Sequence, residues 1–269
     1  MPLIQLFVLA IIQGITEFIP VSSSAHLILA PIAIESWQDQ GPLIDIAAHL
    51  GSLFAVFLYF RDETMMLFRG GIDTLLIRES DNRQLFLFIA LATIPILIVA
   101  GAMVSLDLIT ALRSPLVIGV ASIVFGGLLW HADRSSLSGG SLERLNWRVV
   151  LGIGAAQSLA VIPGVSRSGI TITAARYFGW SRKESARFSM LLAIPTISAF
   201  GLFAGLELIS EGSDGGAAAA LIVAVLSFIS AYLAISIFMK MTERMSFTPF
   251  VIYRILLGLA LIYLAAMVN

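Results

Sequence analysis

Long apolar stretches alternate with short polar segments along the whole chain. The strong apolar stretches lie at 2–19, 43–60, 84–106, 115–131, 185–207, 216–238 and 248–268, with a weaker one at 148–163. A helix needs about 20 apolar residues to cross the hydrocarbon core of a bilayer. Five stretches, those beginning at 43, 84, 185, 216 and 248, meet this length, and 115–131 is short but sufficient. The pattern therefore predicts about six transmembrane helices.

The composition is typical of an integral membrane protein. Hydrophobic residues make up 58% of the 269 residues and charged residues 12%, where soluble proteins carry about 25% charged residues. A net charge of −1 offers no basic face, which excludes a nucleic-acid partner. The absence of cysteine excludes disulfides, cysteine–zinc sites and thiolate chemistry. We expect an all-α integral membrane protein that forms a single polytopic domain over 1–269.

Two apolar stretches are interrupted by proline and hydroxyl residues and then continue for half a span. The first, 2–19, runs into Ile19-Pro-Val-Ser-Ser-Ser-Ala-His26, and the second, 148–163, runs into Pro163-Gly-Val-Ser-Arg-Ser-Gly169. Non-helical backbone is tolerated at membrane depth only where it lines a cavity inside the protein. Each stretch therefore predicts a re-entrant helical hairpin in addition to the six spans.

The distribution of loop charges predicts how the two hairpins are oriented. A shift of 143 residues places Pro20 on Pro163 and Ser23 on Ser166. Lysine and arginine gather in four loops, which the positive-inside rule assigns to the cytoplasm. These loops are 61–83, 132–148, 181–187 and 239–247, whereas 31–42, 107–114 and 208–215 hold a single arginine. Three spans then separate the hairpins, so we expect an inverted-topology repeat with one half at about 1–131 and the other at about 148–269.

The first hairpin contains ionisable and hydroxyl side chains at membrane depth, where they are costly and usually functional. Glu17 is the only carboxylate deep in its apolar stretch, and Gln13 lies four residues before it, on the same helical face. Ser22, Ser23 and then His26 follow the break. The alternative is structural: Glu17 and His26 pair with each other, and the serines cap the returning helix.

The second hairpin supplies a complementary cation. Arg167 is flanked by Ser166 and Ser168 and follows Gly164 closely, with Thr171 one helical turn later. Glycine permits a tight turn, and amides and hydroxyls at a helix N-terminus cradle anions. The guanidinium adds a bidentate donor for phosphate oxygens, unless it instead extends to the cytoplasmic interface. Together the two hairpins predict phosphoryl transfer on a lipid phosphate at mid-membrane.

Both broken segments resemble the signatures of the undecaprenyl-diphosphate phosphatase family, the bacitracin-resistance family of integral membrane enzymes. They read Gln13-Gly-Ile-Thr-Glu17-Phe-Ile-Pro-Val-Ser-Ser-Ser-Ala-His26 and Pro163-Gly-Val-Ser-Arg-Ser-Gly-Ile-Thr171. The resemblance extends along the chain through His49-Leu-Gly-Ser, Ala92-Thr-Ile-Pro95 and Leu192-Ala-Ile-Pro195. Gln13 stands where the family has either glutamate or glutamine, which leaves open whether it is a ligand or a hydrogen-bond donor. Many relatives have Thr-Gly where this chain has Ser24-Ala25.

The resemblance implies a hydrolase that converts undecaprenyl diphosphate to undecaprenyl phosphate, which recycles the carrier lipid of cell-wall synthesis and confers bacitracin resistance. Glu17, Ser23, His26 and Arg167 are then catalytic, with either Ser23 or water as the nucleophile. The remaining residues of the two motifs bind substrate: Gln13, Ser22, Gly164, Ser166, Ser168 and Thr171. The family also implies Mg²⁺ or Ca²⁺, with Glu17 as a ligand, and a site in the bacterial inner membrane that opens to the periplasmic face.

Other readings follow from weaker features. A lipid-phosphate transporter or flippase would use the same inverted repeat and the same anion site, but it has little use for an acid, an imidazole and serines together. Asp45 and His49 could bind a metal, although a polar pair at the membrane interface is commoner. Arg254 lies near the end of the last span and is expected to extend toward the interface. Gly201 and Gly205 form a GxxxG pattern that indicates a homodimer.

Overall fold

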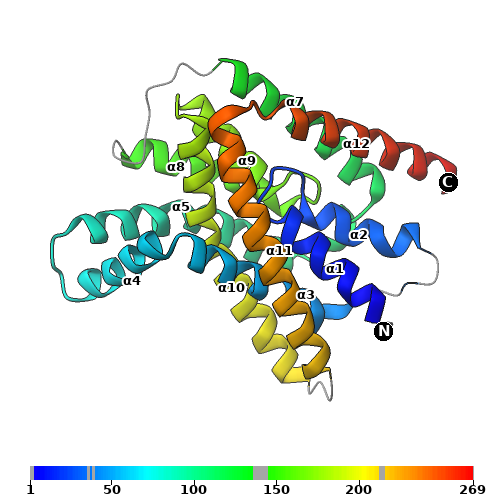
Figure 1. Ribbon diagram of the computed structural model, residues 1–269, viewed down its shortest axis with the longest axis horizontal. Helices are drawn as coiled ribbons and strands as arrows, with labels where there is room; N and C mark the ends of the chain where they lie inside the picture. Colours follow the sequence, from blue (N-terminus) through cyan, green and yellow to red (C-terminus); the bar gives the residue numbers. More distant parts are fainter. Residues whose placement is uncertain (1–2, 35–36, 38–39, 136–144, 212–215, 269) are drawn as a thin grey trace.

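The computed structural model describes residues 3–34, 37, 40–135, 145–211 and 216–268, and these residues form helices and connecting turns with no β-strand (Figure 1). Six helices are long and apolar enough to cross a membrane, as the hydropathy pattern predicts. They are α3 (Gly41–Tyr59), α5 (Asp81–Ser105), α7 (Pro115–Ser135), α10 (Arg182–Glu211), α11 (Ala217–Arg244) and α12 (Thr248–Val268). The chain is therefore an all-helical, multi-pass membrane protein.

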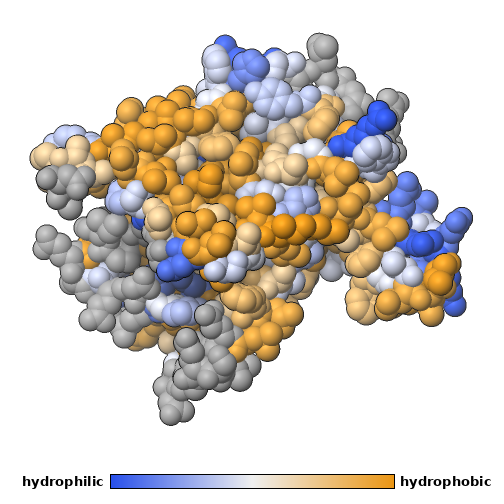
Figure 2. Space-filling view, turned by 180° about the vertical axis from the view of Figure 1, so that it is seen from behind, coloured by the Kyte–Doolittle hydropathy of each residue, from blue (hydrophilic) through white to orange (hydrophobic). Residues whose placement is uncertain are grey.

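The outer surface is apolar, which is the arrangement that a bilayer stabilises. Leu202, Leu221 and Met267 each leave about two thirds of their surface exposed, at 66%, 67% and 69%. Figure 2 shows hydrophobic side chains across most of one face, with hydrophilic residues confined to small areas. In water this surface would cost about 25 cal/mol per Å², whereas lipid tails cover it at no such cost. The exposed apolar side chains thus mark the lipid-facing surface.

Two further segments are each built as helix, break and helix. In the first, α1 (Leu3–Thr16) is followed by turns and then α2 (Ser23–Ala33). In the second, α8 (Trp147–Gln157) continues into a short 3₁₀ helix, η2 (Ser158–Val161), before the break and α9 (Arg167–Tyr177). Both breaks fall where proline and hydroxyl residues predict them.

The residue before each returning helix has the same unusual backbone conformation. Ser22 has φ 74° and Ser166 has φ 68°, a left-handed region that residues other than glycine rarely adopt. These two serines lie 144 positions apart, one more than the shift that places Pro20 on Pro163. The second break has one more residue between its proline and its serine, so the backbone matches Ser23 with Arg167 rather than with Ser166.

The packing of the two halves follows a common plan. Helix α11 packs against α1 and α3, while α5 packs against α8 and α10. Helix α7 pairs with α12, and α3 with α10. Close approach is possible because Gly14 in α1 and Gly154 in α8 have no side chain: a Cβ on either would lie 2.6 Å from a backbone oxygen of the helix opposite, that of Ser227 in α11 or Ala92 in α5. Small residues commonly allow such contacts between membrane helices.

Two short helices lie outside this plan. Helix α4 (Arg61–Leu75) follows α3 directly, and together with the start of α5 it projects from the bundle at the left of Figure 1. Its first turn is tied to α10, because Arg187 Nη2 lies 2.5 Å from Glu63 Oε1. Helix α6 (Ile109–Leu112) is a single turn between α5 and α7.

Candidate active site

Glu17 is the point at which the two breaks meet. It lies at the end of α1, and its side chain is 7% exposed. Its Oε2 accepts hydrogen bonds from Gln13 Nε2 at 2.9 Å and from Ser23 Oγ at 2.7 Å. Its Oε1 accepts from Arg167 Nη2 at 3.2 Å. The structure thus brings together four residues that the sequence assigns to the site, of which Gln13 and Arg167 lie farthest apart in sequence, by 154 positions.

Arg167 lies inside the protein rather than at the membrane interface. Its Nη1 donates to the carbonyl oxygen of Ser189 in α10 at 3.1 Å, and its guanidinium lies 5.9 Å from the centre of the Phe18 ring. With only 11% of its side chain exposed, it cannot extend to lipid headgroups. The interfacial alternative for Arg167 is therefore wrong, and the guanidinium is available as a fixed cation next to Glu17 and Ser23.

The hydroxyl residues of the second break hold this region in place. Ser166 caps α9 by accepting the backbone N–H of Gly169 at 3.1 Å. Ser168 donates to the carbonyl oxygen of Ile19 at 3.0 Å, which joins the second break to the first. Thr171 donates to the hydroxyl of Ser189 at 2.8 Å. All three side chains are buried, so in the ligand-free protein their hydroxyl groups stabilise the cradle.

Gly164 is required by its surroundings. Its φ is +94°, and a Cβ there would lie 2.5 Å from the carbonyl oxygen of Ile118. Its own carbonyl oxygen accepts a hydrogen bond from Arg254 Nη2 at 2.8 Å, and that of Val165 accepts another from the same nitrogen at 2.8 Å. Arg254 is 0% exposed, so the expectation that it extends toward the interface is wrong. The break leaves these carbonyls without helical partners, and the buried guanidinium satisfies them.

His26 is held away from Glu17 by two other partners. Its Nδ1 lies 2.7 Å from the carbonyl oxygen of Ser22, and its Nε2 lies 2.6 Å from the hydroxyl of Tyr253 in α12. A carbonyl can only accept, so Nδ1 carries the hydrogen and the neutral ring accepts from Tyr253 through Nε2. The structural alternative of a Glu17–His26 pair is therefore not the arrangement found. Ser22 makes no side-chain cap to α2, and its hydroxyl lies 3.2 Å from that of Ser24.

His49 lies closer to Glu17 than its sequence pattern predicts. Its Nε2 lies 3.8 Å from Glu17 Oε2, while its Nδ1 lies 2.7 Å from the carbonyl oxygen of Asp45. The Asp45 carboxylate instead accepts from Gln40 Nε2 at 2.7 Å, so the two do not form the side-chain pair expected of a metal site. The sequence offered two signals for His49: its spacing from Asp45, which suggested a metal pair, and the family-like stretch His49-Leu-Gly-Ser.

The oxygen atoms next to Glu17 fit a cation only in part. Within the described ranges, no three His, Asp or Glu side chains are grouped as a metal site would require. Gln13 Oε1 is buried, however, and has no hydrogen-bond partner in the part of the chain that the structure describes. Glu17 and Gln13 are therefore the residues that could hold a hard cation, provided that phosphate and water complete its shell.

Fold and site together define a polytopic membrane protein with an acid, an arginine and a serine hydroxyl at the junction of two broken helices. The chain belongs to the family described as bacitracin resistance protein BacA, whose model matches residues 6–260 and so includes both breaks. Among its relatives is the undecaprenyl-diphosphatase of Maricaulis maris (strain MCS10), 51% identical over 265 residues that cover 97% of this chain and 98% of the relative. Undecaprenyl-diphosphatase 1 of Pseudoalteromonas translucida (strain TAC 125) is 46% identical over 263 residues, with the same two coverages.

Proposed function

We propose that this protein hydrolyses undecaprenyl diphosphate to undecaprenyl phosphate and inorganic phosphate, and so recycles the carrier lipid of cell-wall synthesis and confers bacitracin resistance. The observation that carries the proposal is the contact of Ser23 and Arg167 with opposite oxygens of one buried carboxylate, Glu17. Family membership and the printed names of two full-length relatives support the same reaction.

In the reaction that we propose, Ser23 is the nucleophile and Glu17 its general base. The Ser23 hydroxyl already donates to Glu17 Oε2 at 2.7 Å, which is the geometry that proton transfer requires. Oγ attacks the terminal phosphorus, the proton passes to Glu17, and the bond to the bridging oxygen breaks. Undecaprenyl phosphate leaves, and water then hydrolyses the phosphoserine to release phosphate. Direct attack by water, with Ser23 as a hydrogen-bond donor, is the alternative.

Other residues of the two breaks bind and neutralise the diphosphate. Arg167 provides the cation, and the backbone amides at the start of α9 provide further donors. Ser166, Ser168 and Thr171 support this cradle, and Gly164 lets the chain turn tightly beneath it. We assign His26 as the proton donor to the leaving lipid phosphate, a role that requires the ring to be protonated at Nε2, where the neutral ring now accepts from Tyr253. Gln13 and Ser22 complete the set of substrate-binding residues that we assign.

A divalent cation, Mg²⁺ or Ca²⁺, would be held by Glu17 and by the buried Gln13 Oε1. Such a cation neutralises charge on the diphosphate oxygens when it is bound. The protein residues supply few ligands, so we expect the cation to bind together with the substrate rather than before it.

The arrangement in the membrane is also part of the proposal. We propose two re-entrant hairpins in an inverted-topology repeat, about 1–131 and about 148–269, in a bacterial inner membrane with the site open to the periplasmic face. The matched breaks at Ser22 and Ser166 and the matched packing of α1 on α11 and α8 on α5 support it. A cysteine at Asp107 should react with an impermeant maleimide added outside cells, and one at Asn82 should be protected. The chain has no other cysteine, and labelling of both sites from one side would contradict the topology.

The homodimer stays a prediction. Gly201 packs within the chain, because a Cβ there would lie 3.1 Å from a methyl carbon of Leu50. A Cβ at Gly205 would meet nothing within 4 Å, which leaves that position accessible to a second copy.

Phosphate release by the purified protein in detergent, with farnesyl diphosphate as a soluble substrate, tests the function. The wild-type chain should release phosphate, and Glu17→Gln should not. Arg69→Gln, which removes an exposed charge from α4, should match wild type. A lipid-phosphate flippase is the competing function, favoured by the helix breaks alone. Binding of the diphosphate without phosphate release by the wild-type chain would establish the flippase instead.

A further inference from the structure

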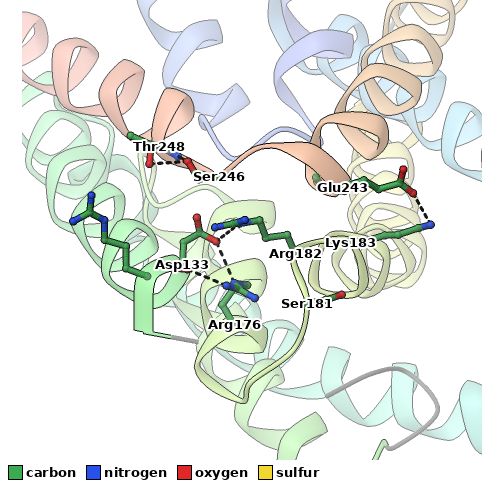
Figure 3. Close-up of a pocket in the computed structure, with 10 residues that line it drawn as sticks. Asp133, Arg176, Ser181, Arg182, Lys183, Glu243, Ser246 and Thr248 are labelled. Carbon is green, nitrogen blue, oxygen red and sulfur yellow. Dashed lines mark hydrogen bonds and ion pairs between the residues drawn. The ribbon is translucent and has the colours of Figure 1, made fainter. Parts of the chain in front are cut away.

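A polar cavity lies at the far end of α9 from the Glu17 site. Its volume is about 770 Å³, which is within the usual range of ligand pockets. It is formed where α7 ends, where α9 turns into α10, and where α11 passes into α12 (Figure 3). These are three of the loops that the positive-inside rule assigns to the cytoplasm. Arg167 at the start of α9 belongs to the first site and Arg176 near its end to this one.

The charges that line this cavity do not cancel. Among the described residues that line it, four cationic side chains face two acidic ones, Asp133 and Glu243. Asp133 is 3% exposed and is shared: its Oδ1 accepts from Arg182 Nε at 2.7 Å and lies 3.2 Å from Arg176 Nε. Figure 3 shows both arginines pointing toward this single carboxylate. Glu243 pairs with Lys183 at 2.6 Å. The excess positive charge therefore remains on the arginines.

Two of the arginines have donors to offer a ligand. Arg176 is consumed by the protein, since its terminal nitrogens donate to the carbonyl oxygens of Trp180 and Asp133. Arg182 uses only Nε, and within the described ranges its two terminal nitrogens have no hydrogen-bond partner. Arg134 is exposed and lies over the ring of Trp130, 4.4 Å from its centre. A guanidinium with free terminal nitrogens matches the oxygens of a phosphate group.

Large aromatic and apolar side chains next to the cavity in sequence are exposed on the surface of the protein. Tyr177 follows Arg176 and is 49% exposed, Met245 follows Arg244 and is 44% exposed, and Trp130 is 39% exposed. Aromatic residues at the end of a span are typical of the headgroup level of a bilayer. Basic pockets between membrane helices at this level bind the headgroups of anionic lipids.

We propose that this cavity binds a phosphate group between Arg182 and Arg134, with the hydroxyls of Ser246 and Thr248 on its opposite side. The surroundings favour the headgroup of an anionic phospholipid, and free phosphate is the other source of the same chemistry. The hydroxyl of Thr248 lies 2.9 Å from that of Ser246, so the pair offers a second polar contact. The proposal is independent of the reaction at Glu17.

Native mass spectrometry of the detergent-purified chain, titrated with phosphatidylglycerol, tests the site. Wild type should bind one molecule more tightly than the rest. Arg182→Gln should weaken that step about tenfold or more, because a charge-assisted hydrogen bond is lost. Arg134→Gln should weaken that step about fivefold. Because Arg134 is exposed, this substitution should leave the fold intact. Arg69→Gln removes the same charge outside the cavity and should leave that binding step unchanged.

Two further arms identify the ligand. Phosphatidylcholine with the same chains should not compete, and equal binding of both lipids, or equal loss in the Arg69, Arg134 and Arg182 variants, would overturn the proposal. Inorganic phosphate is titrated into Arg167→Ala, in which the first site cannot contribute, with thermal stability as the readout. The alternative result is that phosphate raises the thermal stability of the protein in a way that Arg182→Gln abolishes, while no lipid binds selectively. That result would assign the site to free phosphate. Because neither arm measures turnover, failure of the proposed hydrolysis would not affect the result.

Discussion

The two breaks share a backbone shape but are held in different ways. The second is capped by Ser166, is supported by Arg254 at the carbonyls of Gly164 and Val165, and is buried from Gly164 to Ser166. The first has no side-chain cap, its Ser24 is exposed, and its Ser22 carbonyl is held by His26. The difference indicates a division of work: the rigid break fixes the cation that binds phosphate, and the less constrained one carries the residues that exchange protons.

Loss of the fixed cation should have the largest effect. Arg167→Ala should reduce turnover about 10³-fold or more, the range seen when an arginine that stabilises a phosphoryl transition state is removed. Arg167→Lys should recover little, because a lysine cannot reach Glu17 and the Ser189 carbonyl oxygen together. Phosphate release measures the effect, and Arg69→Gln is the control. Near-normal activity of the lysine variant would show that a simple charge suffices.

Loss of the base in the first break should come next. Glu17→Gln keeps the shape and most hydrogen bonds but cannot accept the serine proton, so we expect a loss of about 10²- to 10⁴-fold in kcat. Burst measurements of phosphate release would show whether the chemical step is the one slowed. A variant that lowers substrate affinity with kcat intact would place Glu17 in binding and not in proton transfer.

Substitutions of Ser23 and of its neighbour Ser24 test which group is the nucleophile. If Ser23 attacks, Ser23→Ala should lose essentially all activity, and phosphoserine should accumulate when His26 is altered. If water attacks, the loss should be only about ten- to a hundredfold, the cost of one charge-assisted hydrogen bond. Ser24→Ala, at the exposed neighbouring hydroxyl, should stay close to wild type in both cases. If Ser23→Ala still transfers ¹⁸O from labelled water into phosphate in a single turnover, with a loss no greater than about a hundredfold, the serine mechanism is excluded.

The smallest effect should come from Tyr253, which touches the first break from outside. Tyr253→Phe removes one hydrogen bond to His26 Nε2 and keeps the stacked ring, so we expect a loss of about two- to tenfold. The change should appear in the pH profile of kcat, because the hydroxyl donates to Nε2 of the neutral ring and its loss makes protonation of that nitrogen easier. A Tyr253→Phe profile that overlays the wild-type one would leave the residue a structural role only.

Hydropathy and helix-breaking residues were enough to predict six spans and two breaks, because length and apolar composition decide whether a helix crosses a bilayer. Local spacing also predicted the contact of Gln13 with Glu17, one helical turn apart. The long-range contact between Glu17 and Arg167 followed from chemical complementarity between an isolated acid and an isolated base at membrane depth.

Residues that act through distant packing could not be predicted. Tyr253 reaches His26 across 227 positions, and in sequence it has the pattern of an interfacial aromatic residue. Arg254 looked like an arginine extending to the headgroups, because nothing in the sequence shows that a break 90 positions earlier leaves two carbonyls in need of a donor. The position of His49 beside Glu17 could not be predicted for a similar reason, because it depends on how α3 packs beside α1.

In the buried ion pair of Glu17 with Arg167, the Glu17 carboxylate competes with the phosphate of the product for the guanidinium. Any anion that binds Arg167 must replace a carboxylate that is already 3.2 Å away. A diphosphate can do so with several oxygens, whereas the lipid monophosphate that leaves has fewer oxygens with which to bind Arg167. The ion pair should therefore favour product release over product retention, and undecaprenyl phosphate should be a weak inhibitor despite sharing the whole lipid tail with the substrate.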